Sequence, residues 1–154
     1  MQIETRLNEL GIELAAPKVP VANYVGTKRT GLVLYVSGRV SDQKGEVGSE
    51  LTLEEGYGAA RDTAVLLLAI IKADVGDLDE IASITALRGF VRSAPDFVDQ
   101  PRVIDGASDL LIDLFGEAGR HARTATGTSQ LPSGAAVQLD MVAELRPATS
   151  THAR

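Results

Sequence analysis

The sequence contains no cysteine and no tryptophan, and only 4% of its residues are aromatic. Without cysteine there can be no disulfide, no thiolate nucleophile and no cysteine-based metal site, and the composition fits a cytoplasmic protein. The two histidines, His121 and His152, are too far apart to have the spacing of metal ligands, so we expect no metal site. Nor do we expect a cofactor, because the chain has no glycine-rich nucleotide loop of the required form.

Positive charge and long apolar runs are also scarce. The 15 Lys and Arg residues are outnumbered by 21 Asp and Glu, and they form no basic block. Nucleic acid is therefore not an expected partner, since phosphate-binding surfaces concentrate positive charge. The longest apolar run, residues 64–71, is too short to cross a bilayer, and the first ten residues lack the apolar core of a secretory signal. We expect no membrane association.

The remaining sequence has the composition of one folded domain over residues 1–146, followed by a flexible tail at 147–154. Apolar residues at helical spacing predict three helices, at 2–10, 53–72 and 107–119. Alternating apolar residues and turn signals predict two strands within 23–38, joined by a turn near 28–31, and further strands at 81–91, 123–130 and 135–145. The stretch 32–36 is continuously apolar, which predicts a strand buried on both faces.

This order of elements predicts an α+β domain, with two helices covering one side of a mainly antiparallel sheet and an extra helix in front. The segment 92–106 is expected to be a loop that contains prolines. With both long helices on one side, the other face of the sheet needs a cover, and a second copy of the chain is the expected one.

Arg123 is the most informative single residue, because it opens a short strand of threonines and small residues. A guanidinium offers a planar fork that matches a carboxylate. The alternative is an ordinary surface arginine at the end of a strand, and the residue alone does not decide between the two. His121, two residues earlier, is the one ordered candidate for the base of a catalytic serine, but a partly exposed loop residue is the favoured interpretation.

The residues around Arg123 resemble the late signature of the RidA/YjgF family of small trimeric proteins. The signature consists of an arginine, a strand of small residues, Leu131-Pro132, the turn Ser133-Gly134 and an alternating acidic strand at 137–145. Earlier in the chain, the family's aromatic segment corresponds to Tyr24 and its strand ending in Ser-Gly to Ser37-Gly38. The resemblance extends from about Ala15 to Leu145.

The resemblance implies a chorismate-mutase-like fold (bacillus type), assembled as a homotrimer with three clefts between subunits. It also implies hydrolysis of reactive enamines and imines, such as 2-aminoacrylate and 2-iminopropanoate, to the 2-keto acid and ammonia. Carried over by residue, Arg123 would bind the substrate carboxylate and Tyr24 would close the pocket. Ser37 and the adjoining Gly38 would bind the ligand or water, and Ala125 would contribute main-chain groups. Arg39 is a second candidate for the carboxylate, with a solvent-facing charge as its alternative.

Gln138 departs from the family, because it stands where characterised deaminases of the family carry a glutamate near the water. An amide can orient water but cannot accept a proton from it. Two other functions therefore stay open: a non-catalytic trimeric module that binds small carboxylates and, as the least favoured, an endoribonuclease. The N-terminal helix and the segment 92–106 would lie near the cleft or the trimer edge.

Overall fold

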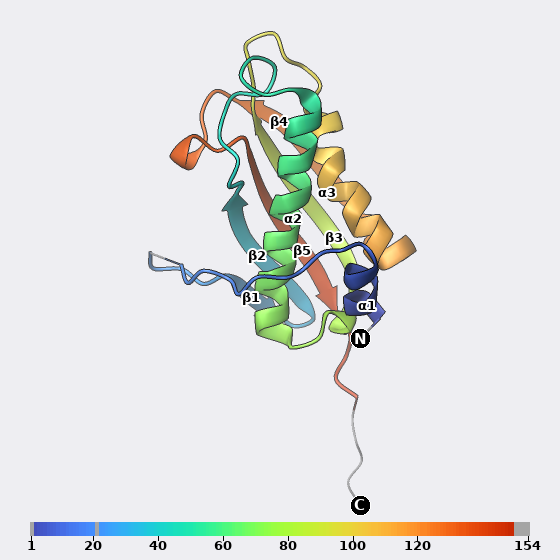
Figure 1. The fold of residues 1–154 in the computed structure, drawn as a ribbon. Helices are drawn as coiled ribbons and strands as arrows, with labels where there is room; N and C mark the ends of the chain where they lie inside the picture. The colour runs from blue at the N-terminus through green and yellow to red at the C-terminus, as the bar shows by residue number, and fades with distance from the viewer. Residues whose placement is uncertain (1, 21, 150–154) are drawn as a thin grey trace, which may run out of the picture.

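The computed structural model describes residues 2–20 and 22–149, and it consists of one sheet with helices on one side (Figure 1). The sheet has five strands in the order β1-β2-β5-β3-β4, in which β3 and β4 run parallel and the other pairs antiparallel. The strands are β1 (Thr27–Thr30), β2 (Val33–Val40), β3 (Ile81–Arg92), β4 (Ala122–Thr128) and β5 (Val137–Leu145). The helices are α1 (Gln2–Glu9), α2 (Leu53–Val75) and α3 (Gln100–Phe115), with short 3-10 turns at Leu78–Glu80, Gly116–Gly119 and Pro132–Gly134. The predicted α+β class and its two-layer arrangement are confirmed.

The core lies between the sheet and the long helices α2 and α3, which lie side by side (Figure 1). Along β5, alternate residues such as Leu139 and Met141 are buried against the helices, while Gln138 and Asp140 lie on the opposite face. This alternation follows from the two-residue period of a strand, as the sequence predicts.

Helix α2 begins where the capping box predicts. The Thr52 hydroxyl accepts a hydrogen bond from the Glu55 N–H, and the Glu55 carboxylate accepts one from the Thr52 N–H. The helix continues past Lys72 to Val75, because Gly76, at φ 85°, is the first residue that leaves the helical conformation.

The prediction that 32–36 is buried on both faces is wrong. Leu34 and Val36 are buried toward the helices, whereas Leu32 is 41% exposed and Tyr35 is 52% exposed on the open side. The reason is that helices cover only one face of the sheet, so a continuous apolar run still alternates between core and surface. The turn also lies later than predicted, at Gly31 and Leu32, since Thr30 pairs with Val33.

Helix α3 begins seven residues earlier than predicted, at Gln100, so the second half of the expected loop 92–106 is helical. Pro101 lies in the first turn of α3, where its missing N–H costs nothing because that group has no helical partner. The helix ends at Phe115, and Gly116–Gly119 forms a separate 3-10 turn. The last two strands are slightly shorter than the predicted 123–130 and 135–145.

The N-terminal helix α1 is held to the body of the domain by Asp79. Its two carboxylate oxygens accept hydrogen bonds from the N–H groups of Gln2 and Ile3, both at 2.9 Å. These backbone donors, that of Ile3 first, lower the pKa of Asp79 to about 2. Beyond β5, residues 147–149 belong to no helix or strand, and the rest of the expected tail lies outside the described residues. Within the described residues, no helix is both long and apolar enough to cross a membrane.

Asp79→Ala should lower the free energy of unfolding by about 1 kcal/mol at pH 6, as the loss of a helix cap does. Because the folded protein lowers the pKa of Asp79, its contribution is fully present above about pH 4 and is lost as the pH falls toward 2. Urea unfolding at several pH values checks this. The wild type and the variant should converge near pH 2, while Asp96→Ala, at an exposed site, should match the wild type throughout. A difference that does not depend on pH would contradict the role assigned to the Asp79 charge.

Candidate functional site

Four of the predicted site residues line one open hollow on the uncovered face of the sheet. This sheet-face hollow has a volume of about 540 Å³ and brings together Tyr24, Ser37, Gly38 and Gln138. The residues come from the segment before β1, from β2 and from β5, so the hollow forms only once the strands pair.

A bulge in β2 gives the sheet-face hollow its shape. The register between β2 and β5 shifts between Val36 and Arg39, and Ser37 and Gly38 lie in that irregularity. The Ser37 hydroxyl donates a hydrogen bond to the Val25 carbonyl at 2.6 Å, which ties the bulge to the segment that carries Tyr24. A Cβ atom at Gly38 would lie 3.6 Å from the Gln138 side-chain nitrogen, so the two residues are direct neighbours.

Arg88 is a residue of the sheet-face hollow that the sequence analysis missed. Its Nε donates to Asp140 at 3.0 Å, and its guanidinium lies 5.8 Å from the centre of the Phe90 ring. The two-residue alternation along β3 could have placed Arg88 on the same face as Gln138. The ion pair with Arg88 occupies Asp140, which is the acidic side chain nearest to Gln138 along β5.

Arg123 borders a second hollow on this face, but its guanidinium turns toward α3. Arg123 is paired in register with the buried Leu87, so its side chain leaves the strand on the helix side. The Nη1 group donates to Asp105 Oδ1 at 2.7 Å and to Ser108 Oγ at 3.2 Å, both on α3. Ala125 shares this side of β4, as predicted. Within one chain, the guanidinium is therefore not in the sheet-face hollow.

His121 is the partly exposed loop residue that the sequence predicts, and both of its ring nitrogens lie within hydrogen-bond distance of a partner. Its Nε2 lies 2.9 Å from Ser108 Oγ, and its Nδ1 lies 2.7 Å from the carbonyl oxygen of Gly119. Ser108 is 8% exposed. The sequence did not point to Ser108, because it lies on the buried side of a helix, whereas its partners His121 and Arg123 lie 13 and 15 residues later, outside that helix.

Arg39 lies apart from both groups. It is partly buried on the helix side of β2, where its Nη2 donates to the Lys18 carbonyl at 3.2 Å. Its buried Nε has no hydrogen-bond partner in the part of the chain that the structure describes. It borders a groove with Leu66 and Ile70 of α2. The structure thus places Arg39 neither beside Arg123 nor in the sheet-face hollow, and it is not the solvent-facing charge of the alternative prediction.

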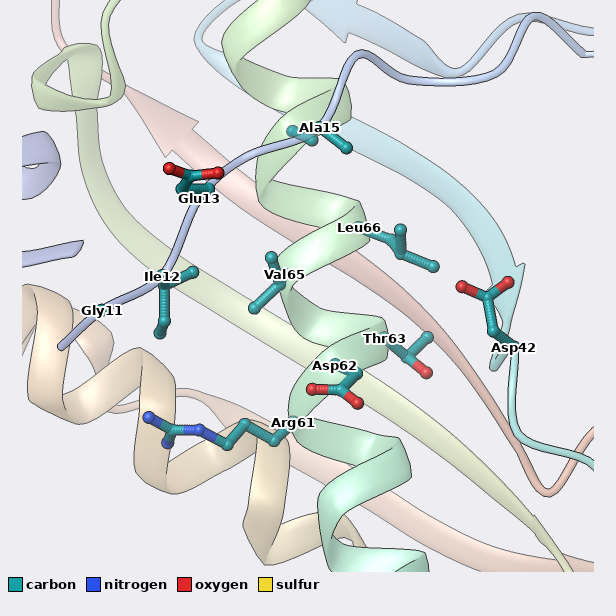
Figure 2. Close-up of a pocket in the computed structure, with 11 residues that line it drawn as sticks. Gly11, Ile12, Glu13, Ala15, Asp42, Arg61, Asp62, Thr63, Val65 and Leu66 are labelled. Carbon is teal, nitrogen blue, oxygen red and sulfur yellow. The ribbon is translucent and has the colours of Figure 1, made fainter. Parts of the chain in front are cut away.

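A further concave surface lies on the outer side of α2, beneath the segment that follows α1 (Figure 2). Its charged groups are Glu13, Asp42 and Asp62 against the single guanidinium of Arg61. Asp62 is already bonded to Gln43 Nε2 at 2.8 Å. Three carboxylates against one guanidinium disfavour an anionic ligand, so this groove is not the candidate site for a small carboxylate. Among residues 2–20 and 22–149, no group of three metal-ligating side chains comes together.

Comparison with known proteins identifies the family. A family model described as YjgF/chorismate mutase-like, putative endoribonuclease, matches residues 4–145. Protein TCP17 of Trypanosoma cruzi is 42% identical over an alignment of 151 residues that covers 94% of this chain and 94% of that one. The crystal structure of Atu1372 from Agrobacterium tumefaciens, a protein of unknown function, is 42% identical, with a TM-score of 0.88 over 94% of this chain and 92% of that one. A putative endoribonuclease from Shewanella oneidensis is 32% identical, with a TM-score of 0.90 over 94% of this chain and 100% of that one. The chain belongs to the YjgF/chorismate-mutase-like family.

Proposed function

We propose that this protein hydrolyses small 2-imino acids to 2-keto acids and ammonia, in clefts between the subunits of a homotrimer. The observation that carries the proposal is the division of the site residues between two places. Tyr24, Ser37 and Gln138 line the sheet-face hollow, whereas the Arg123 guanidinium lies at the helix side of the edge strand β4. The cysteine-free composition is consistent with a cytoplasmic location for this reaction.

A cleft that contains both groups forms where the β4 edge of one subunit meets the sheet face of another. β4 lies at the edge of the sheet, and its outer edge has no strand partner among residues 2–20 and 22–149. The sheet face opposite the helices carries the exposed side chains of Tyr24, Val25 and Tyr35, which suit burial against a neighbouring subunit. The predicted homotrimer would cover both the open edge of β4 and the exposed side chains of the sheet face.

The chemistry needs few groups, because 2-imino acids are intrinsically labile. Arg123 would bind the carboxylate and so fix the imine carbon, and the Gln138 amide would orient the attacking water. Water adds to the C=N carbon, the resulting amino alcohol loses ammonia, and the oxygen of the water becomes the keto oxygen. Positioning of this kind accelerates the reaction without the acid–base contribution that a glutamate would make at residue 138.

A second candidate is a trimeric module that binds small carboxylates without hydrolysing them. Gln138 favours it, since an amide cannot accept a proton and the nearby Asp140 is held by Arg88 at 3.0 Å. Endoribonuclease activity, which the names of some relatives carry, has less support from this chain. Its 21 acidic residues outnumber 15 basic ones, which is the opposite of an RNA-binding surface.

The test is the release of ammonia and keto acid from freshly generated 2-iminopropanoate. We expect the wild type to accelerate hydrolysis, and Arg123→Ala to lose about a hundredfold in kcat/KM, because a bidentate charged contact is lost. Gln138→Glu should raise kcat by about tenfold or more, since it restores a group that transfers protons. An inert wild type with an active Gln138→Glu variant would instead establish the binding module. If Arg123→Ala is as active as the wild type, the site is wrongly placed.

A further inference from the structure

We infer that Asp105, Ser108 and His121 position Arg123, so that the Nε–Nη2 edge of its guanidinium binds the carboxylate of the ligand. The sequence assigned no role to Asp105 or Ser108, and it offered His121 only as a disfavoured candidate for a catalytic base. The inference rests on the proposed function in one respect, namely that Arg123 binds a 2-imino or 2-keto acid. It adds which edge of the guanidinium does so and which residues hold that edge in place.

Nη1 of Arg123 is fully engaged within the chain. It donates to Asp105 Oδ1 at 2.7 Å and to Ser108 Oγ at 3.2 Å, which uses both of its hydrogens. Asp105 and Ser108 are three residues apart on α3, so they lie on one face of the helix and converge on the same nitrogen. The contact to Asp105 is short because both groups are charged.

The direction of the Ser108 hydroxyl follows from its other neighbour, His121. The Gly119 carbonyl can only accept a hydrogen bond, so His121 Nδ1, 2.7 Å away, carries the ring proton. In the neutral ring, Nε2 then accepts the hydroxyl proton of Ser108 at 2.9 Å. The serine oxygen is thereby left with its lone pairs toward Arg123. His121 acts on the guanidinium through Ser108 and not directly.

The Nε–Nη2 edge remains for a ligand. Neither nitrogen has a partner among residues 2–20 and 22–149, and the side chain of Arg123 is 25% exposed. This edge carries two parallel N–H groups, the arrangement that binds a carboxylate in a bidentate manner. With Nη1 fixed at one corner, the guanidinium loses little further freedom when the ligand binds.

The scaffold that carries these residues is tightly packed. Gly106, next to Asp105, lies so close to α2 that a Cβ atom there would overlap the carbonyl of Tyr57. Gly119, whose carbonyl orients His121, lies equally close to the backbone of α3 at Leu111. Both contacts exclude any side chain, so direct backbone packing sets the distance of α3 from α2 at Gly106 and from the segment before β4 at Gly119.

The positioning role makes a prediction opposite to that of simple charge competition. If Asp105 only competed with the ligand carboxylate, its removal would tighten binding. If Asp105 positions Arg123, its removal loosens binding, and an amide at the same place restores it, because the amide oxygen still accepts from Nη1.

The experiment measures pyruvate binding by titration calorimetry, together with KM and kcat for 2-iminopropanoate. Asp105→Ala should raise both the Kd for pyruvate and KM about tenfold, with kcat within about twofold, and Asp105→Asn should stay within about threefold of the wild type. Ser108→Ala should raise Kd and KM about fivefold. The matched control is Asp109→Ala, which removes a carboxylate from the same helix whose partner is the Tyr57 hydroxyl at 2.6 Å and not Arg123. Its Kd and KM should equal those of the wild type.

Binding that is unchanged or tighter in Asp105→Ala overturns the inference, as does an equal loss in Asp105→Asn and Asp105→Ala. Thermal unfolding of each variant separates a loss of structure from a loss of positioning. If Asp105→Ala does not fold, Asp105→Asn, which keeps the hydrogen bond, still allows the comparison with the wild type. A wild type that binds pyruvate without hydrolysing the imine refutes the proposed hydrolysis and leaves the positioning role standing. A wild type that binds no pyruvate refutes both.

Discussion

Gly106→Ala should lower the free energy of unfolding by about 3 kcal/mol or more, the upper range for overpacking in a core. The new methyl group would overlap the carbonyl of Tyr57 and approach the Arg61 backbone nitrogen at 3.3 Å, and neither backbone group can rotate away. The helices α2 and α3 would have to separate. Urea unfolding followed by circular dichroism measures the change.

The matched control for Gly106 is Gly58→Ala, one residue beyond Tyr57 on α2. A Cβ atom at Gly58 would meet nothing within 4 Å. This substitution should stabilise the protein by about 0.5–1 kcal/mol, because alanine loses less backbone entropy than glycine in a helix. Equal effects at the two glycines would show that helix contact does not determine the outcome. Because Asp105 and Ser108 flank Gly106, the Gly106→Ala protein should also bind pyruvate less tightly.

Ser41→Ala should destabilise the protein by about 2 kcal/mol, because the buried Val137 N–H loses its acceptor, whereas the Ala136 N–H keeps a second acceptor, the Gln43 carbonyl at 3.0 Å. Ser41 is 5% exposed, and its hydroxyl oxygen accepts from the N–H groups of Ala136 and Val137 at 3.1 and 3.2 Å. The hydroxyl in turn donates to the Gln43 carbonyl at 2.7 Å. Ser41 thus joins the end of β2 to the start of β5, immediately before Gln138.

Thermal and urea unfolding check the Ser41 prediction against Ser49→Ala. The Ser49 hydroxyl bonds the Glu46 carboxylate at the surface, so its loss should change stability by less than about 0.5 kcal/mol. If Ser41→Ala is as stable as Ser49→Ala, water satisfies the freed Val137 N–H and the join between β2 and β5 does not depend on the serine.

The sequence predicted the fold where a regular pattern and a stop signal coincide. The capping box fixed the start of α2, and the alternation along β5 separated Gln138 and Asp140 from the buried Leu139. The pattern failed at α3, because Pro101 is an ordinary loop signal that is equally compatible with a first helical turn. It failed again at Leu32–Val36, since hydrophobicity alone does not say whether one face or two are covered.

Some residues of the candidate site were predictable from the sequence, but Arg88 and Ser108 were not, and neither was the geometry. Tyr24, Ser37 and Gln138 do share a hollow, which a motif and a two-residue period can suggest. The side of the sheet that Arg123 faces depends on the parallel register of β3 and β4, and its partners Asp105 and Ser108 depend on how α3 packs. Neither follows from spacing along the chain, because both are contacts between different elements.

The central place of β5 has a consequence for the synthesis of the protein. β5 comes after the other four described strands along the chain, yet it pairs with both β2 and β3 in the middle of the sheet. While a ribosome is still making residues 137–145, the hairpin β1-β2 and the unit β3-α3-β4 therefore have no strand between them. The nascent chain must carry both pieces with their apolar faces incompletely covered until its final strand emerges, and only insertion of that strand completes the sheet.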